Sequence, residues 1–335
     1  MNIKNKDFIF NEFGVSGRED KVKEKLKDFL KDKVDDLFED RNNSLITLKK
    51  GNKKNNKLKI MLSSHYDTIG FVATYITKEG FVRFSEVGYL PAYNIISKRV
   101  IFENGTVGVI FADENENIKK GEKNKYFIDI GAKDEEEAKK LIKIGDMGAI
   151  YSPYIIQNDN IISSWLDDRI GCFILLEIIE NLKDNIHDIY FVFSSQEEVG
   201  LRGATTSTFK IEPDIGIAFD VTGTDDITKK HYYCNSILGN GAAIKVMDGS
   251  VISDKRLVNF LETLAKQNNI KYQLDILTYG GTDAGAIQTS KSGVIAGGIS
   301  IPTRYIHSAN EMCSLKDVQS CIDLGLLFCK SDVII

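Results

Sequence analysis

The sequence contains few cysteines and prolines and no long hydrophobic run. Its 335 residues include five cysteines and four prolines. An odd number of cysteines with no Cys-x-x-Cys spacing fits neither a disulfide framework nor a thiolate zinc site, so a reducing compartment is the simpler interpretation. No stretch approaches the roughly 18 apolar residues of a membrane span, and the N-terminus lacks the uninterrupted apolar segment of a signal peptide. We therefore expect a cytoplasmic protein with no membrane partner.

A marked excess of charge of one sign is also absent. Lysine and arginine number 43 against 48 aspartates and glutamates, which gives a formal net charge of -5. Because this balance provides no general attraction to polyanions, we expect no nucleic-acid partner. At this length, a hydrophobic share of 42% is enough for one large domain or two ordinary ones.

Strand and helix patterns alternate along much of the chain. Short apolar runs at 58–64, 188–194, 214–219 and 294–300 are typical of strands buried on both faces of a largely parallel sheet. Helical patterns occur at 171–182, 255–268 and 315–329. The alternation predicts an α/β fold in which helices cover both faces of the sheet, an α/β/α sandwich.

Near the N-terminus the sequence predicts an amphipathic helix and then a loop. Ser16 and Glu19 have the S-x-x-E spacing of a capping box. Apolar residues then recur at helical spacing from Val22 to Leu37. The basic, Asn-rich stretch 49–59 is interpreted as a solvated loop.

The sequence pattern changes between residue 71 and about residue 160. Alternating β-type runs are broken there by Gly and Asn, and only 133–144 resembles a helix. We predict a small β-rich domain at 70–160, inserted into an α/β catalytic domain formed by residues 1–69 and 161–335.

Polar residues follow three of the predicted strands, at the edge of an α/β sheet where ligands bind. They are His65 and Asp67, then Glu197 and Glu198, then Asp220. Asp167 and Asp168 precede a predicted helix, and His307 follows the fourth strand. Imidazoles and carboxylates gathered in one crevice require a cation to offset repulsion and desolvation. Nitrogen and oxygen ligands suit zinc, cobalt or manganese, and two such ions could activate both a carbonyl group and a water molecule.

Taken singly, these residues have simpler interpretations. His65 could be a buried, hydrogen-bonded core residue, Glu197 and Glu198 a solvated pair, and Asp167 the partner of Arg169 in a local salt bridge. Their joint occurrence at strand ends favours the metal site, but it leaves the roles of the individual carboxylates open.

Six sequence blocks resemble, in order, those of the M42 family of metallo-aminopeptidases. They are HYDTIGFV (65–72), SWLDDRIG (164–171), SSQEEVGLRGA (194–204), AFDVTGT (218–224), YGGTDAGA (279–286) and RYIHSANE (304–311). The resemblance implies a Zn-peptidase-like fold, an inserted domain used for dimerisation, peptide substrates, and homo-oligomers ranging from dimers to dodecamers. It also implies two divalent metal ions, with zinc the first choice and cobalt or manganese as alternatives.

The resemblance also implies roles for particular residues. The metal ligands would be His65, Asp167, Glu198, Asp220 and His307, with Asp167 bridging the two ions. Glu197 would act as general base, and Asp67 would orient His65 through a hydrogen bond. Asp167 is preferred over Asp168 because the family commonly has Asn at the second position.

The sequence departs from the family pattern in two places. Thr68 stands where the family has a glutamate, and residues 87–95 lack an expected double glycine. Both changes concern specificity and assembly more than chemistry. The alternative functions are another metal-dependent amide hydrolase such as a deacylase, a glycosidase that uses two carboxylates and no metal, and a catalytically silent assembly protein.

Overall fold

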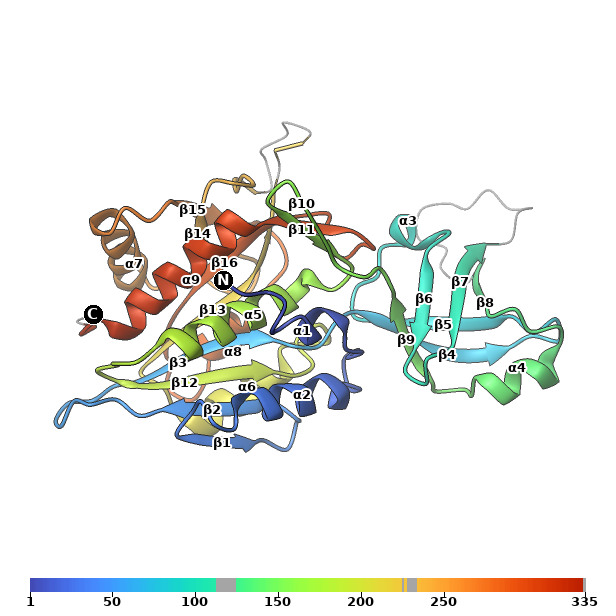
Figure 1. Ribbon diagram of the computed structural model, residues 1–335, viewed down its shortest axis with the longest axis horizontal. Helices are drawn as coiled ribbons and strands as arrows, with labels where there is room; N and C mark the ends of the chain where they lie inside the picture. The colour runs from blue at the N-terminus through green and yellow to red at the C-terminus, as the bar shows by residue number, and fades with distance from the viewer. Residues whose placement is uncertain (113–124, 225, 228–233, 334–335) are drawn as a thin grey trace.

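The computed structural model describes residues 1–112, 125–224, 226–227 and 234–333, and shows a large α/β body beside a small β-barrel (Figure 1). The sheet of the α/β body comprises β1 (Asp36–Glu39), β2 (Leu45–Lys49), β3 (Lys59–His65), β10 (Ile155–Gln157), β11 (Asn160–Ser163), β12 (Asp188–Ser194), β13 (Ile215–Gly223), β14 (Ala242–Met247), β15 (Tyr272–Ile276), β16 (Ile295–Arg304) and β17 (Glu311–Ser314). Its order is β1-β2-β12-β3-β13-β16-β17-β11-β10, and β14 pairs with both β16 and β15.

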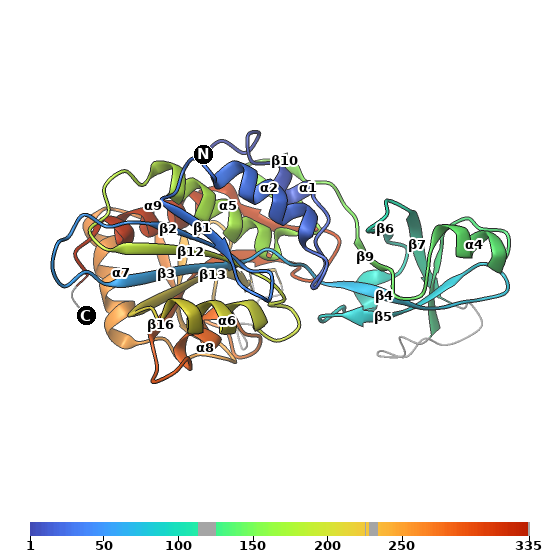
Figure 2. The same cartoon turned by 90° about the horizontal axis from the view of Figure 1, so that it is seen from below.

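The centre of this sheet is formed by the four strands predicted from apolar runs. Strands β12, β3, β13 and β16 are adjacent and parallel, and their residues are largely buried. One face is covered by α1 (Phe8–Asn11), α2 (Asp20–Leu30), α5 (Leu166–Asn181), α7 (Lys255–Gln267) and α9 (Leu315–Lys330). Helices α6 (Arg202–Ile211) and α8 (Asp283–Gln288) cover the other face (Figure 2). The predicted α/β sandwich is therefore confirmed, because helices on both sides account for strands that are apolar on both faces.

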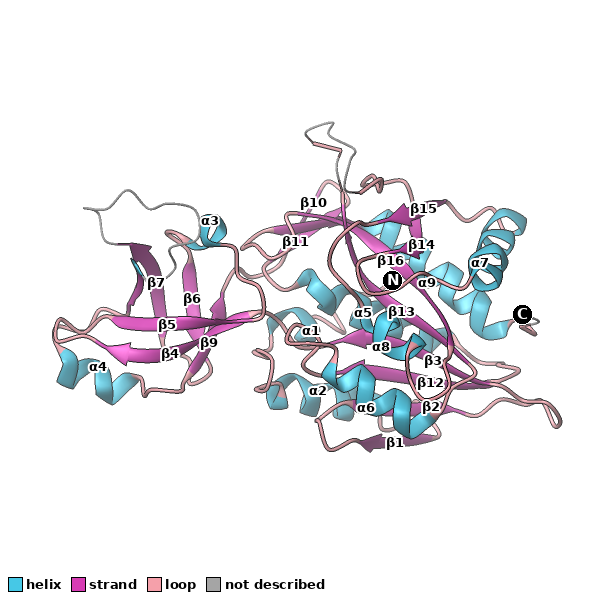
Figure 3. Cartoon of the chain, turned by 180° about the vertical axis from the view of Figure 1, so that it is seen from behind, coloured by secondary structure: helices cyan, strands magenta, loops and turns pink. Residues whose placement is uncertain are grey.

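The barrel stands to one side and has a core of its own (Figure 3). It comprises β4 (Gly70–Ile76), β5 (Val82–Val87), β6 (Arg99–Phe102), β7 (Val107–Ala112), β8 (Tyr126–Asp129) and β9 (Met147–Ile150), closed in the order β4-β5-β8-β7-β6-β9. Helix α4 (Glu135–Leu141) lies within the predicted helical segment, whereas the short α3 (Ala92–Ile95) was not expected. The β-rich insertion is confirmed. Its predicted limits, 70 and 160, stay a prediction.

The N-terminal helix is shorter than predicted. Helix α2 ends at Leu30, and Asp36–Glu39 instead form β1, which pairs with β2 in antiparallel orientation. Val34, in the connection before β1, and Leu37, in β1, still pack against the main core, so apolar residues that suggested a longer helix are partly buried without one.

The predicted capping box does not form. The Ser16 hydroxyl donates to Asp67, 51 residues away, and Glu19 accepts a hydrogen bond from the backbone N–H of Gly17. A long-range partner for Ser16 thus replaces the local one.

Two further observations concern the described part of the chain. It contains no helix both long and apolar enough to span a membrane. All five cysteines are buried as free thiols.

Candidate metal centre and active site

Six of the seven predicted site residues line one cavity of about 650 Å³; they are His65, Asp167, Glu197, Glu198, Asp220 and His307. His65 ends β3, Glu197 and Glu198 follow β12, and Asp220 lies in β13. These three strands are parallel, so their carboxyl ends meet at the same edge of the sheet. Asp167 comes from the first turn of α5, and His307 from the connection between β16 and β17.

Asp167 lies between the two histidines. Its Oδ1 is 3.1 Å from Nε2 of His65, and its Oδ2 is 3.2 Å from Nε2 of His307. Burial opposes ionisation of Asp167, but hydrogen bonds from His307 and His65 outweigh it and hold the pKa of this carboxyl below its usual range. One carboxylate therefore presents an oxygen atom to each imidazole.

The other carboxylates of the cavity lie close to the same two histidines. Glu198 Oε2 is 3.3 Å from Nε2 of His307, and Asp220 Oδ1 is 3.8 Å from Nε2 of His65. Glu197 Oε2 is also 3.8 Å from Nε2 of His65. Burial raises the pKa of Glu197, Glu198 and Asp220, and the negative charges of neighbouring carboxylates raise it further. The cluster holds more buried carboxylates than its two imidazoles can neutralise.

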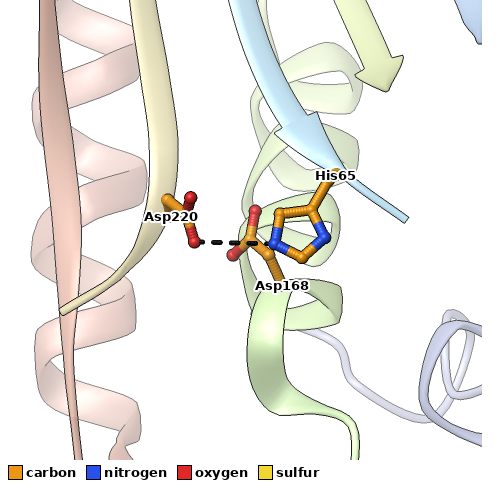
Figure 4. A group of neighbouring side chains, drawn as sticks. All are labelled: His65, Asp168 and Asp220. Atoms are coloured by element: carbon orange, nitrogen blue, oxygen red, sulfur yellow. Dashed lines mark ion pairs between the residues drawn. The ribbon is translucent and has the colours of Figure 1, made fainter. Parts of the chain in front are cut away.

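Asp168 also approaches the cluster. His65, Asp168 and Asp220 form one group whose ligand atoms lie within 4.8 Å of one another (Figure 4). His65, Asp167 and Glu198 form a second such group. Geometry alone therefore admits either aspartate as a ligand.

The hydrogen bonds of the two aspartates separate them. Asp168 Oδ2 accepts from the Ser64 hydroxyl, and its Oδ1 accepts from the backbone N–H of Gly171 at 3.1 Å. Asp167 directs both oxygens at imidazoles instead. Both oxygens of Asp168 are therefore occupied by hydrogen bonds from β3 and α5. This favours Asp167 as the group that bridges the two ions.

Asp67 lies behind the cluster, fully buried, and contacts more than His65. Its carboxylate accepts hydrogen bonds from the backbone N–H groups of Glu197, at 2.9 Å, and Glu198, at 3.3 Å. It also accepts from the Ser16 hydroxyl at 2.6 Å. Nδ1 of His65 is 3.1 Å from the backbone oxygen of Asp67 and 3.6 Å from its carboxylate. The nearest contact to His65 is therefore made by the backbone, while the carboxylate holds the loop that carries both glutamates.

Sequence reasoning missed Glu311, the first residue of β17. This buried side chain accepts the backbone N–H of His307 at 2.8 Å and that of Asp167 at 3.0 Å. It thereby ties together two candidate ligands that are 140 positions apart. Its only sequence signal was its place in the block RYIHSANE, four residues after His307.

Asp283 at the start of α8 was also missed as a site residue. It accepts hydrogen bonds from the hydroxyl of Ser63 in β3 and from that of Ser194 in β12, the latter at 2.5 Å. It therefore fixes the two strands that lead into His65 and Glu197.

Thr68, which stands where the family pattern has a glutamate, does not line the cavity. Its backbone N–H donates to Gly14 at 3.0 Å, and its oxygen accepts from Ser16 at 3.2 Å. The second difference from the family pattern, the loop 87–95, does line the cavity, through Tyr89 and Pro91. Of the two differences, this loop is therefore the one that can influence which substrates the cavity accepts.

The donor set fits divalent cations. It offers two imidazole nitrogens and several carboxylates with no thiolate, and Glu198 Oε1 is buried without a hydrogen-bond partner among the described residues. Such oxygen and nitrogen donors suit zinc or a similar ion, which would offset the repulsion between the buried acids. The fold and this site define an α/β protein with a candidate centre for divalent metal ions.

Comparisons with known proteins identify the family. Residues 43–324 match the model of the M42 glutamyl aminopeptidase family, and the chain belongs to this family. A candidate aminopeptidase from Acetivibrio thermocellus is 45% identical over 93% of each chain. The structure of an aminopeptidase from the archaeon Desulfurococcus kamchatkensis matches with a TM-score of 0.93 and 34% identity, covering 99% of this chain and 95% of that one. A Pyrococcus horikoshii TET1 peptidase, described as assembling into a tetrahedron or a large octahedral shell, matches with a TM-score of 0.85 and 29% identity over 98% of each chain.

Proposed function

We propose that this aminopeptidase uses two divalent metal ions and removes N-terminal residues from peptides. His65, Asp167 and Asp220 would hold one ion, and Asp167, Glu198 and His307 the other. The observation that carries the proposal is the placement of the two Asp167 oxygens, one towards each imidazole. Zinc is the first choice for this donor set, and cobalt and manganese are the alternatives.

The ions, when bound, would polarise the scissile carbonyl and lower the pKa of water. Glu197 then acts as general base. Its side chain lines the cavity and is only 10% exposed, and burial raises its pKa above the usual value. Glu197 takes a proton from the attacking water and delivers it to the leaving amine.

We also propose that the enzyme requires a substrate with a free N-terminus. A substrate α-amine is positively charged, and the carboxylates gathered at this end of the cavity attract it. A blocked N-terminus lacks that charge.

The barrel supports the expectation of a homo-oligomer. Val107, Val109 and Phe111 project from β7 and are more than one-third exposed. Such an apolar face is typical of an interaction surface. We propose that the barrel mediates dimer contacts from which assemblies up to a dodecamer are built.

The decisive assay compares a free peptide with its N-acetylated form, using protein stripped of metal and then reloaded with zinc, cobalt or manganese. We expect cleavage of the free peptide only after reloading. Release of the acyl group from the blocked peptide would instead support a deacylase, and no cleavage with any metal would reject the proposal.

A further inference from the structure

The cavity lining is charged only around the cluster formed by His65, Asp167, Glu197, Glu198, Asp220 and His307. Every charged residue in its described lining, together with both histidines, belongs to the cluster. The remaining wall is uncharged and includes Leu201, Val221, Leu277, Tyr279, Tyr305 and Ile306. A substrate whose α-amine lies among the acids would therefore place its first side chain against an uncharged, largely apolar surface.

A lysine behind this wall is already paired. Lys245 Nζ lies 2.6 Å from Asp275 Oδ2, and both side chains are fully buried. The other oxygen of Asp275 accepts hydrogen bonds from the hydroxyls of Thr222 and Ser236. Thr222 follows the lining residue Val221 in β13, so this pair supports the wall while offering the cavity no net charge.

An arginine beside the wall is paired in the same way. Arg304 lies between the lining residues Thr303 and Tyr305, but its guanidinium forms two hydrogen bonds with Asp226, at 3.0 and 2.7 Å. Such a bidentate pair satisfies both charges. Neither basic residue is thus available to recognise an acidic side chain.

Gly223 lies on the same wall, close to two of its side chains. A Cβ atom built on it would lie 3.2 Å from the Tyr279 hydroxyl and 3.7 Å from Leu277. A side chain at residue 223 would crowd the Tyr279 hydroxyl, so glycine at this position lets Tyr279 and Leu277 lie close against β13.

We infer that this site prefers a neutral, apolar or aromatic N-terminal residue over an acidic or a basic one. The inference rests on the proposed aminopeptidase function. Among the residues that the structure describes, a glutamate or lysine side chain entering this wall would lose hydration without gaining a charged partner, whereas a leucine or phenylalanine would bury apolar surface there.

The test uses the metal-loaded enzyme and the p-nitroanilides of leucine, phenylalanine, glutamate and lysine. We expect kcat/KM for the leucyl or phenylalanyl compound to exceed that for both charged ones by about tenfold or more. Faster cleavage of the glutamyl or lysyl compound would overturn this inference alone. Inactivity on all four would overturn the proposed function with it.

A matched pair of variants locates the effect on the wall. Tyr279 lines the cavity and its side chain is 54% exposed. Tyr279→Asp introduces a negative charge, and Tyr279→Asn makes nearly the same change of shape without charge. Relative to Asn, the Asp variant should raise the lysyl-to-leucyl ratio of kcat/KM by up to about fivefold, the upper limit for an exposed ion pair. An unchanged ratio would contradict the placement of the substrate side chain beside Tyr279.

Discussion

The carboxylate of Asp67 accepts the backbone N–H of Glu197 at 2.9 Å. The proposed general base is therefore held in place through its own backbone by a buried group that does not line the cavity. The same carboxylate accepts the backbone N–H of Glu198, so one side chain fixes the position of the base and of a candidate ligand, while the backbone oxygen of Asp67 contacts His65.

Asp67→Asn should therefore impair turnover. The amide carries no charge and turns two N–H donors towards groups that themselves donate, so the loop of Glu197 should shift. Changes to groups that orient ligands typically cost about 10- to 100-fold. We expect kcat to fall within that range at saturating metal. A wild-type kcat would show that the hydrogen bonds of Asp67 do not matter to the reaction.

Glu197→Gln should separate catalysis from metal binding. Glutamine keeps the shape of the side chain but cannot accept the proton of water, so kcat should fall about 100-fold or more. Metal content, measured by mass spectrometry on the purified protein, should not change. The neighbouring Glu198→Gln provides the matched control, because it should lose bound metal. Undiminished turnover in Glu197→Gln would show that Glu197 is not the general base.

Glu311→Gln should weaken metal binding. The glutamine amide would meet one of the two backbone N–H groups that Glu311 now accepts, and the segments of His307 and Asp167 should separate. We expect about 10- to 100-fold lower metal affinity in a competition titration with a chromogenic chelator. Asn310→Ala, an exposed change on the preceding residue, is the control. Equal metal affinities for the two variants would show that Glu311 does not position the metal ligands.

Glu19 should make stability depend on pH. Burial, reinforced by the charge of Asp67, raises the pKa of Glu19 from 4.5 to about 7. The folded state therefore favours the neutral carboxyl, and its stabilising contribution is present below pH 4.5 and lost as the pH rises through about 7. Between pH 5 and 8 this loss amounts to about 2 kcal/mol.

Glu19→Gln cannot ionise and should remove that loss. In urea titrations at pH 5 and pH 8, the variant should show a smaller decrease in the free energy of unfolding than the wild type. Glu24→Gln alters an exposed carboxylate on α2 and should behave like the wild type. Identical pH dependence for all three proteins would contradict the assignment.

The sequence predicted the central sheet well because its four parallel strands are covered on both faces and must be apolar throughout. It also placed His65, Glu197, Glu198 and Asp220 near one another, because the strand ends of a parallel sheet meet at one edge. Helix and strand could not be distinguished at Leu37, since either element packs this side chain against the core. That choice depended on pairing with β2.

Contacts between distant segments were beyond sequence reasoning. Ser16 carries a local capping signal but donates to Asp67, and Glu311 resembles any acidic residue until it lies beside Asp167 and His307. The pairing of Lys245 with Asp275 likewise depends on two strands whose register only the structure gives. These hydrogen bonds and ion pairs shape the site around the candidate ligands.

The most direct test of the two-ion site is anomalous diffraction from a crystal of the zinc-loaded protein. We expect two peaks about 3.5 to 4 Å apart, the spacing of paired catalytic ions. One should lie beside His65 and Asp220, the other beside Glu198 and His307, with Asp167 contacting both. A single peak, or two peaks joined by Asp168 instead of Asp167, would contradict the proposed metal centre.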